Sequence, residues 1–572
     1  MTTLLVASSA WCQAPEYCDA VMIQGFYWDS YKADDDIDKP ADYFGPTTWS
    51  ELLSQVDELS ASFDMIWLPP SAKSSGGVGY HPKQWCNQNG EWGTEAELKT
   101  LIAAFHNNDT RVIADIVINH RDGNTTWTDF FDEDFGAYGQ FTLSPGENFI
   151  CADDECKDNG FEPKGNNDAG YDLIGGAWGG YAASRDLDHS NLTVQEAIKA
   201  YLKWMKNEIG YDGWRFDLVK GYLGKYIEIY TKAADAYYSV GEYWDGSYDA
   251  LKKWVNDTGW NSTCFDFCAK YSLYNGTLSN GDYRAMTNMY NFPNGLCGAD
   301  EMKRYATTFV DNHDTFRDVN RFSGNWDKAN AVLLASPGIP CVFYPHWVSC
   351  KSNIQNMIAA RKACGIHSQS PCVTDGTCES YYRSVTTGTK GKLVCYVGHD
   401  WTAPSDCELA CCGDGWAFYT QMSNEKFYIA GNGSEGGVWC DGNTWIPDGV
   451  ELKDNATYTV AVEPGEYIFK ITDGTWLNSW GYSSVNGSSS TPGYTSNEND
   501  NICFSVEEPT LVSIYFDAAT RRINLKLTDN NVTTISNVKS DGKGSVRKYL
   551  KDGQMIIEKD GVRYNIAGCK ME

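Results

Sequence analysis

The stretch GWRFDLV, from Gly213 to Val219, decides the fold class of this chain. Its apolar residues alternate with Arg215 and Asp217 at the period of two that is typical of a β-strand. Charged side chains are seldom fully buried unless they are paired or take part in function. The pattern therefore predicts a strand that points an Arg and an Asp into the interior of a sheet or barrel, where they serve a purpose.

Strand-like runs on either side of this stretch alternate with helical patterns. They lie at 20–28, 64–68, 111–119, 237–244, 263–268, 305–310 and 340–345, and amphipathic helices are predicted at 94–108 and 193–210. Eight strands alternating with helices predict an α/β fold, a (β/α)8 TIM barrel. A doubly wound parallel sheet is the alternative that the pattern leaves open.

The remaining segments differ in composition from the barrel. The interval 121–192 is rich in Gly, Asn and Asp and is too long for a βα loop, so it predicts a subdomain inserted after the third strand. Helical patterns stop after residue 362, and short β-type runs follow. We expect barrel segments at 15–120 and 193–362, the inserted domain B at 121–192, a small β domain C at 363–420, a β-sandwich at 421–527 and a C-terminal tail at 528–572.

Composition narrows the range of partners. The 572 residues carry a formal net charge of −30 and the sequence pI is about 4.6. Nucleic-acid binding depends on basic patches, and no such patch is present in the sequence. No run of about 20 apolar residues exists, so no membrane span is expected. Neutral substrates and metal cations remain as ligands.

The cysteine content indicates a compartment. The chain has 20 Cys, none of them in paired CxxC units with zinc spacing. This density favours disulfides in an oxidising environment, although pairings cannot be deduced. The N-terminal run MTTLLVASSAWCQA ends in small residues but lacks a basic region. A weak or truncated secretion signal is one interpretation of it and an unrelated start is the other, and we expect a secreted protein.

Polar residues follow several of the predicted strands, where a barrel carries its functional groups. A cleaved glycosidic bond needs one ionised carboxylate and one carboxyl group that holds a proton. An Arg beside the first keeps that carboxylate ionised. We expect Arg215 to do this for Asp217. The residues that follow the third, fourth, fifth and seventh strands are Asn119, His120, Asp217, Glu242, Asp311, His313 and Asp314.

Four motifs in this order resemble the conserved regions of the α-amylase family of glycoside hydrolases, family 13. They are DIVINH, GWRFDLVKGY, GEYW and FVDNHD, and SRDLDH resembles the fifth region of that family. QGFYWDS, IWLPPSAKSSGGVGYHP and SPGIPCVFY are most similar to plant-type and related bacterial members. The resemblance covers roughly residues 18–420. It implies endo-hydrolysis of α-1,4-glucans with retention, with Asp217 as nucleophile, Glu242 as general acid/base and Asp314 as the third carboxylate.

The resemblance also assigns residues that hold the sugar. It implies that His120 and His313 bind the glucose at the cleaved position and that Tyr80 stacks beneath it. It implies that Lys220 lines the product-side subsites. Ordinary hydrogen bonding in the core is the alternative role for the two histidines.

A structural calcium ion joining the barrel to the inserted domain is a further implication of the resemblance. The implied ligands are the side chains of Asn119, Asp168 and Asp186 and the carbonyls of Tyr171 and Gly221. Ligation by oxygen atoms alone from distant segments suits Ca²⁺.

The stretch 421–527 resembles the starch-binding β-sandwiches appended to bacterial amylases. The segment that carries this similarity is GEYIFKITDGTWLNSWGY. Aromatic faces suit the apolar face of glucose, and the candidate stacking residues are Trp439, Trp445, Trp476, Trp480 and Tyr482. A place in the core is the alternative for two or three of them.

The sequence therefore predicts an endo-acting α-amylase that is a monomer and whose partner is starch or a related α-glucan. A maltooligosaccharide-forming or transglycosylating relative is an alternative, because the active-site motifs barely separate these activities. A non-catalytic starch-binding protein is a third hypothesis, and the presence of Asp217, Glu242 and Asp314 argues against it.

Overall fold

A computed structural model describes most of the chain. The described residues are 13–33, 36, 42–167, 184–274, 282–317, 319–423, 425–433, 445–452, 457–486, 493–529, 546–551, 554–559 and 562–564. Asp168, Tyr171 and Trp439 lie outside them, so the roles predicted for these three residues concern positions that the structure does not describe.

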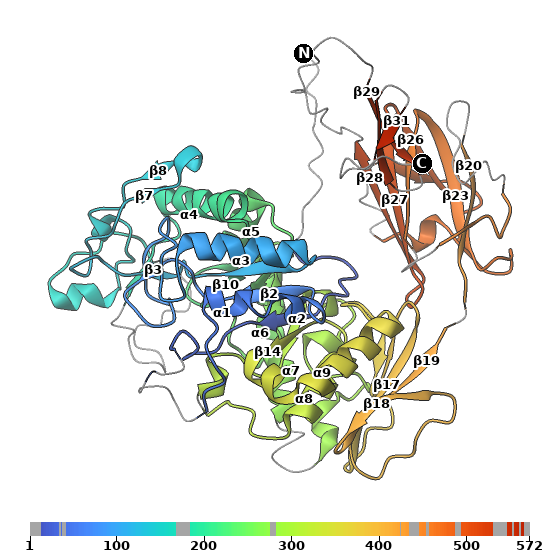
Figure 1. Ribbon diagram of the computed structural model, residues 1–572, viewed down its shortest axis with the longest axis horizontal. Helices are drawn as coiled ribbons and strands as arrows, with labels where there is room; N and C mark the ends of the chain where they lie inside the picture. The colour runs from blue at the N-terminus through green and yellow to red at the C-terminus, as the bar shows by residue number, and fades with distance from the viewer. Residues whose placement is uncertain are drawn as a thin grey trace.

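Eight of the described strands close into a parallel barrel, as the sequence predicts, and the doubly wound alternative is excluded (Figure 1). The ring order is β1-β14-β13-β12-β11-β10-β5-β2. The bounds are β1 Met22–Gln24, β2 Met65–Leu68, β5 Arg111–Ile116, β10 Gly213–Phe216, β11 Tyr238–Gly241, β12 Thr263–Phe265, β13 Ala306–Phe309 and β14 Ile339–Phe343. Seven of these strands fall within the predicted runs, and β14 begins at Ile339, one residue before the run predicted at 340–345.

Helices connect the strands. They are α1 Trp49–Leu53, α2 Val56–Ser60, α3 Glu95–Asn107, α4 Leu192–Trp204 with a π-helical extension Met205–Ile209, α5 Gly224–Ala234, α6 Tyr248–Asp257, α7 Phe267–Tyr274, α8 Trp326–Ala335 and α9 Tyr344–Cys364. The start of helix α3 is fixed by hydrogen bonds between Thr94 and Glu97. The hydroxyl of Thr94 accepts the Glu97 N–H, and the Glu97 carboxylate accepts the Thr94 N–H at 2.7 Å. This capping box satisfies amide groups that the first turn leaves without helical partners.

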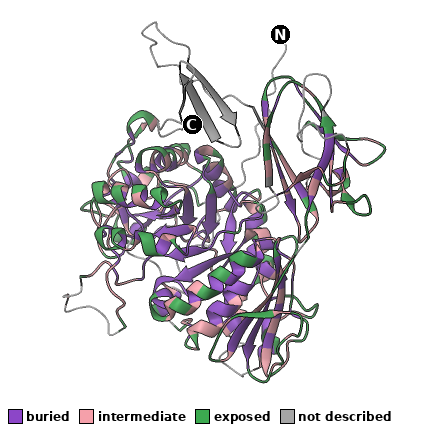
Figure 2. Cartoon of the chain, turned by 45° about the vertical axis from the view of Figure 1, so that its right-hand side comes forward, coloured by how far each residue is buried: buried purple, intermediate pink, exposed green. Residues whose placement is uncertain are grey.

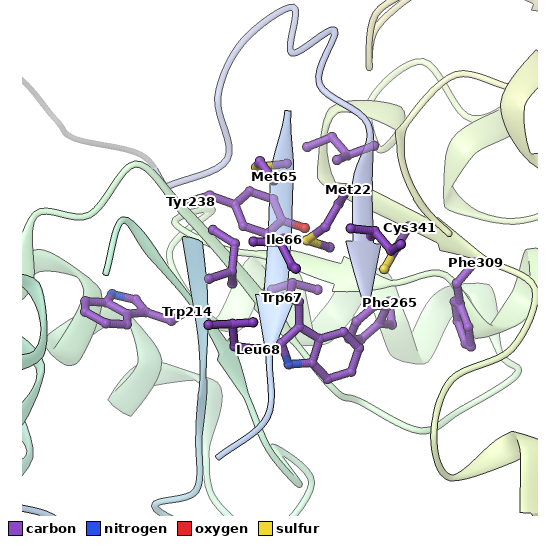
Figure 3. Packing of buried hydrophobic residues seen from close by; sticks show 14 of the residues in the cluster. Met22, Met65, Ile66, Trp67, Leu68, Trp214, Tyr238, Phe265, Phe309 and Cys341 are labelled. Carbon is purple, nitrogen blue, oxygen red and sulfur yellow. The ribbon is translucent and has the colours of Figure 1, made fainter. Parts of the chain in front are cut away.

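The barrel interior is packed with large apolar side chains (Figure 3). Trp67 and Phe265 lie with ring centroids 5.5 Å apart, and Phe309 lies 5.3 Å from Phe265. Figure 2 shows the same strands as the most continuously buried part of the chain. Because this packing is dense, the polar side chains near the carboxyl ends of the strands are held by a rigid support.

The segment inserted between β5 and α4 is irregular, and its strands are short. Strand β6 (His120–Arg121) pairs with β9 (Arg185–Asp186), and β7 (Glu133–Asp134) pairs with β8 (Gln140–Phe141). Short 3₁₀ helices lie at Gly136–Tyr138, Gly146–Asn148 and Glu155–Asn159. Buried ion pairs from Arg121 to Glu133 at 2.7 Å and from Arg185 to Asp154 at 2.9 Å help to order it.

Antiparallel sheets follow the barrel. The first has the order β15-β16-β17-β19-β18, with bounds Cys372–Val373, Tyr381–Thr387, Gly391–Gly398, Trp416–Met422 and Glu408–Gly413. It packs on α8, where the Thr386 hydroxyl donates to the Ala335 carbonyl at 2.6 Å.

Two further sheets enclose a second core. One contains β20 Tyr428–Gly433, β21 Val450–Glu451, β23 Gly465–Thr472, β24 Ser479–Trp480, β25 Tyr494–Ser496 and β26 Ile502–Val506, and the other β22 Thr457–Val462, β27 Thr510–Asp517 and β28 Arg522–Asp529. Ile429, Phe469 and Ile514 are among the residues buried between them. Strands β29 Val546–Lys551, β30 Gln554–Lys559 and β31 Val562–Tyr564 form a separate small sheet.

The C-terminal sheets contact the amino-terminal end of the barrel, away from the carboxyl ends of its strands. His367, which follows α9, lies with its Nε2 3.3 Å from the carboxylate of Asp517 at the end of β27. The ring of Tyr17, which precedes β1, packs on His367 and on Tyr515 at 5.1 Å each. Asn486 donates a hydrogen bond to the Tyr17 hydroxyl. The structure thus docks the sandwich through a buried polar contact.

The described residues bear on two expectations, one about the cysteines and one about membrane spans. No disulfide joins any two of the 17 cysteines in the described part of the chain, so the structure gives the expectation of disulfides no support. Burial raises the pKa of many of these thiols, for example Cys364 to about 12. Among the described helices, none combines the length and apolar character that a membrane crossing requires.

Candidate active site

A buried arginine organises the carboxyl end of the barrel. Arg215 on β10 has no exposed side-chain area, and its Nη1 lies 2.8 Å from Asp115 and 2.7 Å from Asp217. Its Nη2 lies 2.6 Å from Glu242, which follows β11. Strand register explains part of this arrangement, because Arg215 is the direct neighbour of Asp115 on β5. One cation therefore holds three carboxyl groups from three adjacent strands.

Burial shifts the protonation of this cluster. It raises the pKa of Asp217 to about 6, although the charge of Arg215 acts in the opposite direction. It raises the pKa of Glu242 to about 7, again against Arg215 and with help from the negative charge of Asp217. Arg215 therefore lowers the pKa of Asp217, as predicted, but burial raises this pKa by more. At neutral pH the arrangement favours an ionised Asp217 beside a Glu242 that still carries its proton for part of the time.

The backbone after Asp217 adopts an uncommon conformation. Leu218 has a φ of 45°, in the left-handed region that residues with a side chain seldom adopt. Its N–H donates to the Glu242 carboxylate at 3.2 Å. Strain of this kind persists where the surroundings fix it, and it is often found beside functional groups. Here the turn aims Asp217 and Glu242 toward the same space.

Asp314 and two histidines complete the rim. Asp314 follows β13, and 29% of its side chain is exposed; burial and then the charge of Glu242 raise its pKa. His313 contacts Gln24 through Nδ1 at 3.0 Å. His120 contacts the Tyr80 carbonyl through Nε2 at 2.8 Å. Burial lowers the pKa of both imidazoles, so both are neutral at pH 7 and suit hydrogen bonding to a neutral ligand.

Flat rings line the space beside these groups. Tyr80 and His313 lie with centroids 5.0 Å apart and planes within 6° of parallel. The Tyr80 hydroxyl donates to Asp115 at 2.6 Å, and so does the Trp67 indole at 3.1 Å. Trp28, from the segment after β1, is parallel to both rings at 6.0 Å. A stacked aromatic array of this kind presents an apolar face to a sugar ring.

Lys220 lies on the other side of the rim. Its ammonium contacts the carboxylate of Asp245 at 2.9 Å and lies 5.0 Å from the centre of the Tyr243 ring. Both partners follow β11, so Lys220 and Asp245 border the side of the site that Glu242 faces.

The donor set around Asn119 fits a hard cation. The Oδ1 of Asn119 is buried and makes no hydrogen bond among the described residues. A Cβ added to Gly221 would lie 1.8 Å from this oxygen, so only glycine leaves the space open. Pairing of β6 with β9 brings Asp186 opposite His120, the neighbour of Asn119. The predicted ligands Asn119, Asp186 and Gly221 are therefore grouped at the base of the inserted domain, with oxygen donors that suit Ca²⁺.

The C-terminal aromatic candidates fall into two groups. Trp445 and Trp476 lie with ring centroids 6.2 Å apart, and Trp476 is 47% exposed. Trp480 instead packs against Phe427 and Phe516, and Tyr482 is partly buried against the same core. The arrangement favours the first pair as a surface for a ligand and a core role for Trp480.

Several residues of the site are absent from the prediction. Asp115, Trp28, Asp245 and Arg317 all lie within it or at its edge. Asp115 had a usable signal, because a carboxylate in the middle of the apolar run RVIADIVIN is seldom buried without a function. The other three follow strands in irregular segments, where no periodicity marks them.

Comparisons with known proteins agree with this geometry. Residues 51–370 match the family described as alpha amylase, catalytic domain. The chain is 31% identical over 390 residues to alpha-amylase 3, chloroplastic, of Arabidopsis thaliana, which is 64% of this chain and 40% of that protein. It is 26% identical over 457 residues to a glucan 1,4-alpha-maltotetraohydrolase of Stutzerimonas stutzeri, which is 73% of this chain and 75% of that enzyme.

Among solved structures, a gamma-CGTase from an alkalophilic Bacillus clarkii has a similar fold. It superposes with a TM-score of 0.54 at 13% identity and covers 90% of this chain and 83% of its own. At this identity the likeness concerns the fold alone, a barrel followed by β domains.

Proposed function

Because the chain belongs to the α-amylase family of glycoside hydrolases, we propose that it is an endo-acting enzyme that hydrolyses α-1,4-glucosidic bonds of starch and related α-glucans with retention. The observation that carries the proposal is the joint contact of Asp217 and Glu242 with the guanidinium of Arg215, at 2.7 and 2.6 Å. Retaining glycosidases hold their two carboxyl groups about 5–5.5 Å apart. Neighbouring nitrogens of one guanidinium support a separation of that order.

In this mechanism Asp217 attacks the anomeric carbon and forms a glycosyl ester, while Glu242 gives its proton to the leaving oxygen. Glu242 then takes a proton from water, and that water breaks the ester and restores the starting configuration. The raised pKa of Glu242, about 7, suits the first of these roles because the group keeps its proton until the leaving oxygen needs it.

The remaining residues orient the sugar. Asp314 accepts hydrogen bonds from its hydroxyl groups, and neutral His120 and His313 add donors and acceptors of fixed direction. Tyr80 supports the ring from below. These groups exclude water from one face of the sugar and hold its anomeric carbon near Asp217. Holding the two reacting atoms in this orientation lowers the barrier to the reaction.

We assign a calcium ion to Asn119, Asp186 and the Gly221 carbonyl. When bound it would tie the barrel to the inserted domain and carry no step of the reaction. A chelator is expected to lower the melting temperature and Ca²⁺ to restore it. Asn119→Ala is expected to abolish that restoration while leaving the chelated protein unchanged. Equal melting curves with and without Ca²⁺ would contradict the assignment.

Starch hydrolysis followed in two ways tests the main proposal. An endo-acting enzyme destroys the iodine colour of soluble starch while few reducing ends have appeared, and Glu242→Gln is expected to be inactive. Slow colour loss with abundant small sugars would favour a maltooligosaccharide-forming enzyme, the activity named for the Stutzerimonas relative. Retention of starch without any hydrolysis would favour a binding protein instead.

The C-terminal sandwich is proposed as a starch-binding domain, supported by the exposed Trp476 beside Trp445. Trp476→Ala is expected to weaken retention on starch granules and to leave hydrolysis of a short soluble substrate unchanged. We also propose a secreted monomer. The apolar N-terminal run supports secretion, and light scattering after size exclusion tests the monomer.

A further inference from the structure

A cavity of about 340 Å³ adjoins the catalytic rim on the side of β1 and β13. Its size lies at the lower end of the range of ligand pockets, about 300–1,000 Å³. Its lining residues are Tyr27, Trp28, Asp29, Asp42, His313, Phe316, Arg317 and Arg321. His313 belongs to both the cavity and the rim, so a chain bound at Asp217 continues directly into this space.

The cavity lies opposite the Lys220–Asp245 pair. Lys220 and Asp245 follow β10 and β11, whereas the cavity is built from segments that follow β1 and β13, farther around the ring. If Glu242 protonates the leaving oxygen on the side of Lys220, the cavity receives the glycone, which is the part of the glucan that becomes bound to Asp217.

Arg317 lies flat over the indole of Trp28, with its guanidinium carbon 3.5 Å from the ring centroid. The backbone N–H of Arg317 donates to the backbone carbonyl of Asp314 at 3.2 Å, within one turn of the chain. A stacked guanidinium keeps its N–H donors in the plane of the group, at the edge of the stack. The stack therefore fixes a row of donors along the cavity wall without the entropy cost of ordering a free lysine chain.

The charges around the cavity are balanced. Asp42 pairs with Arg321 at 2.7 Å, and Arg321 lies over the ring of Phe316 at 3.8 Å. Asp29 pairs with Lys32 at 3.1 Å. The lining carries two carboxylates and two guanidinium groups beside its aromatic faces. It therefore favours neither an anion nor a cation, and it suits a neutral ligand with many hydroxyl groups.

We propose that Arg317 is a specificity-determining residue that, stacked on Trp28, hydrogen-bonds hydroxyl groups of the glucan on the glycone side. It thereby sets how strongly hydrolysis depends on the number of glucose units there. This inference rests on the proposed function.

Nitrophenyl α-maltooligosides of increasing length test the inference, because release of nitrophenol places every glucose unit on the glycone side. In the unaltered protein kcat/KM is expected to rise with length. Arg317→Ala is expected to flatten the rise, with a loss of about tenfold for the longer glycones and no change for the shortest. Arg317→Lys, which keeps the charge but not the planar fork, is expected to lose nearly as much.

The matched control is Arg284→Ala, which removes an exposed cation paired with Asp282, away from the cavity. Its length dependence is expected to equal that of the unaltered protein. A loss in Arg317→Ala that is the same at every length, or no loss at all, would overturn the inference while leaving the proposed function intact. Absence of activity in the unaltered protein on these substrates and on starch would remove the proposed function itself.

Discussion

Two buried cations, Arg215 and Lys270, each hold carboxylates near the carboxyl end of the barrel, but their surroundings differ. Arg215 faces Asp115, Asp217 and Glu242. Lys270 on α7 faces one carboxylate, Asp311 at 3.0 Å, and the carbonyls of Val310 and Asn320 at 3.0 and 2.9 Å. Both cations are shielded from water, so the number of carboxylates around each decides the protonation of the site.

The two clusters shift pKa values in opposite directions. Burial raises the pKa of Asp115 to about 6, against the charge of Arg215 and with help from the negative charge of Glu242. Burial also opposes ionisation of Asp311, but a contact with His346 and the charge of Lys270 outweigh it and lower its pKa. An excess of carboxylates gives a site that can hold and release a proton at neutral pH. A balanced pair gives a fixed anchor for the segment that carries His313 and Asp314.

The largest expected effect is on catalysis at the first cluster. Glu242→Gln removes the proton donor and keeps the shape, so kcat on starch is expected to fall by about 10²–10⁴-fold. A substrate with a good leaving group needs less protonation, so its loss is expected to be much smaller. The control is Glu301→Gln, an exposed acid paired with Lys252. Equal losses on both kinds of substrate would remove the acid role from Glu242.

At the second cluster, Lys270 with Asp311, the expected effect is on the free energy of unfolding. Lys270→Met leaves Asp311 buried without its counter-ion, which typically costs about 3–5 kcal/mol in the free energy of unfolding. Urea denaturation of the barrel measures this. Adding Asp311→Asn is expected to recover part of the loss, because the uncompensated charge disappears. Lys252→Met removes an exposed pair and is expected to cost under about 1 kcal/mol. If Lys270→Met lost no more stability than Lys252→Met, the role of the Lys270–Asp311 pair as an anchor would be contradicted.

The pH dependence of stability separates the clusters further. The folded-state pKa of Glu242, about 7, lies above its ordinary value of 4.5. Its contribution to stability is therefore present below pH 4.5 and is lost as pH rises through 7, a change of about 3 kcal/mol. Glu242→Gln avoids this loss. The variant is expected to be more stable than the unaltered protein at pH 8 and equal to it at pH 4, as measured by thermal unfolding. If Glu242→Gln were less stable than the unaltered protein at pH 8, the upward shift of the Glu242 pKa would be contradicted.

The sequence predicts much of this arrangement because strand periodicity and motif order are local properties. The barrel strands follow from them, and so does the contact between Arg215 on β10 and Asp217, which comes directly after that strand. Asp115 meets Arg215 only through the pairing of β5 with β10, which depends on barrel closure. Arg317 meets Trp28 across segments that follow β13 and β1. Trp480 and Trp476 are close in sequence but differ in burial because one faces Phe427 and Phe516 in the second core.

The smallest expected effect concerns the hydroxyl of Tyr80. Tyr80→Phe removes its hydrogen bond to Asp115 and keeps the ring that stacks on His313. Asp115 retains Arg215 and the Trp67 indole, so a loss of about 1–1.5 kcal/mol in stability and of less than tenfold in kcat/KM is expected. Tyr80→Leu removes the ring as well and is expected to lose considerably more activity. If the two variants lose the same activity, then Tyr80 acts by holding Asp115 against Arg215, and the excess of carboxylates at that cluster depends on its hydroxyl.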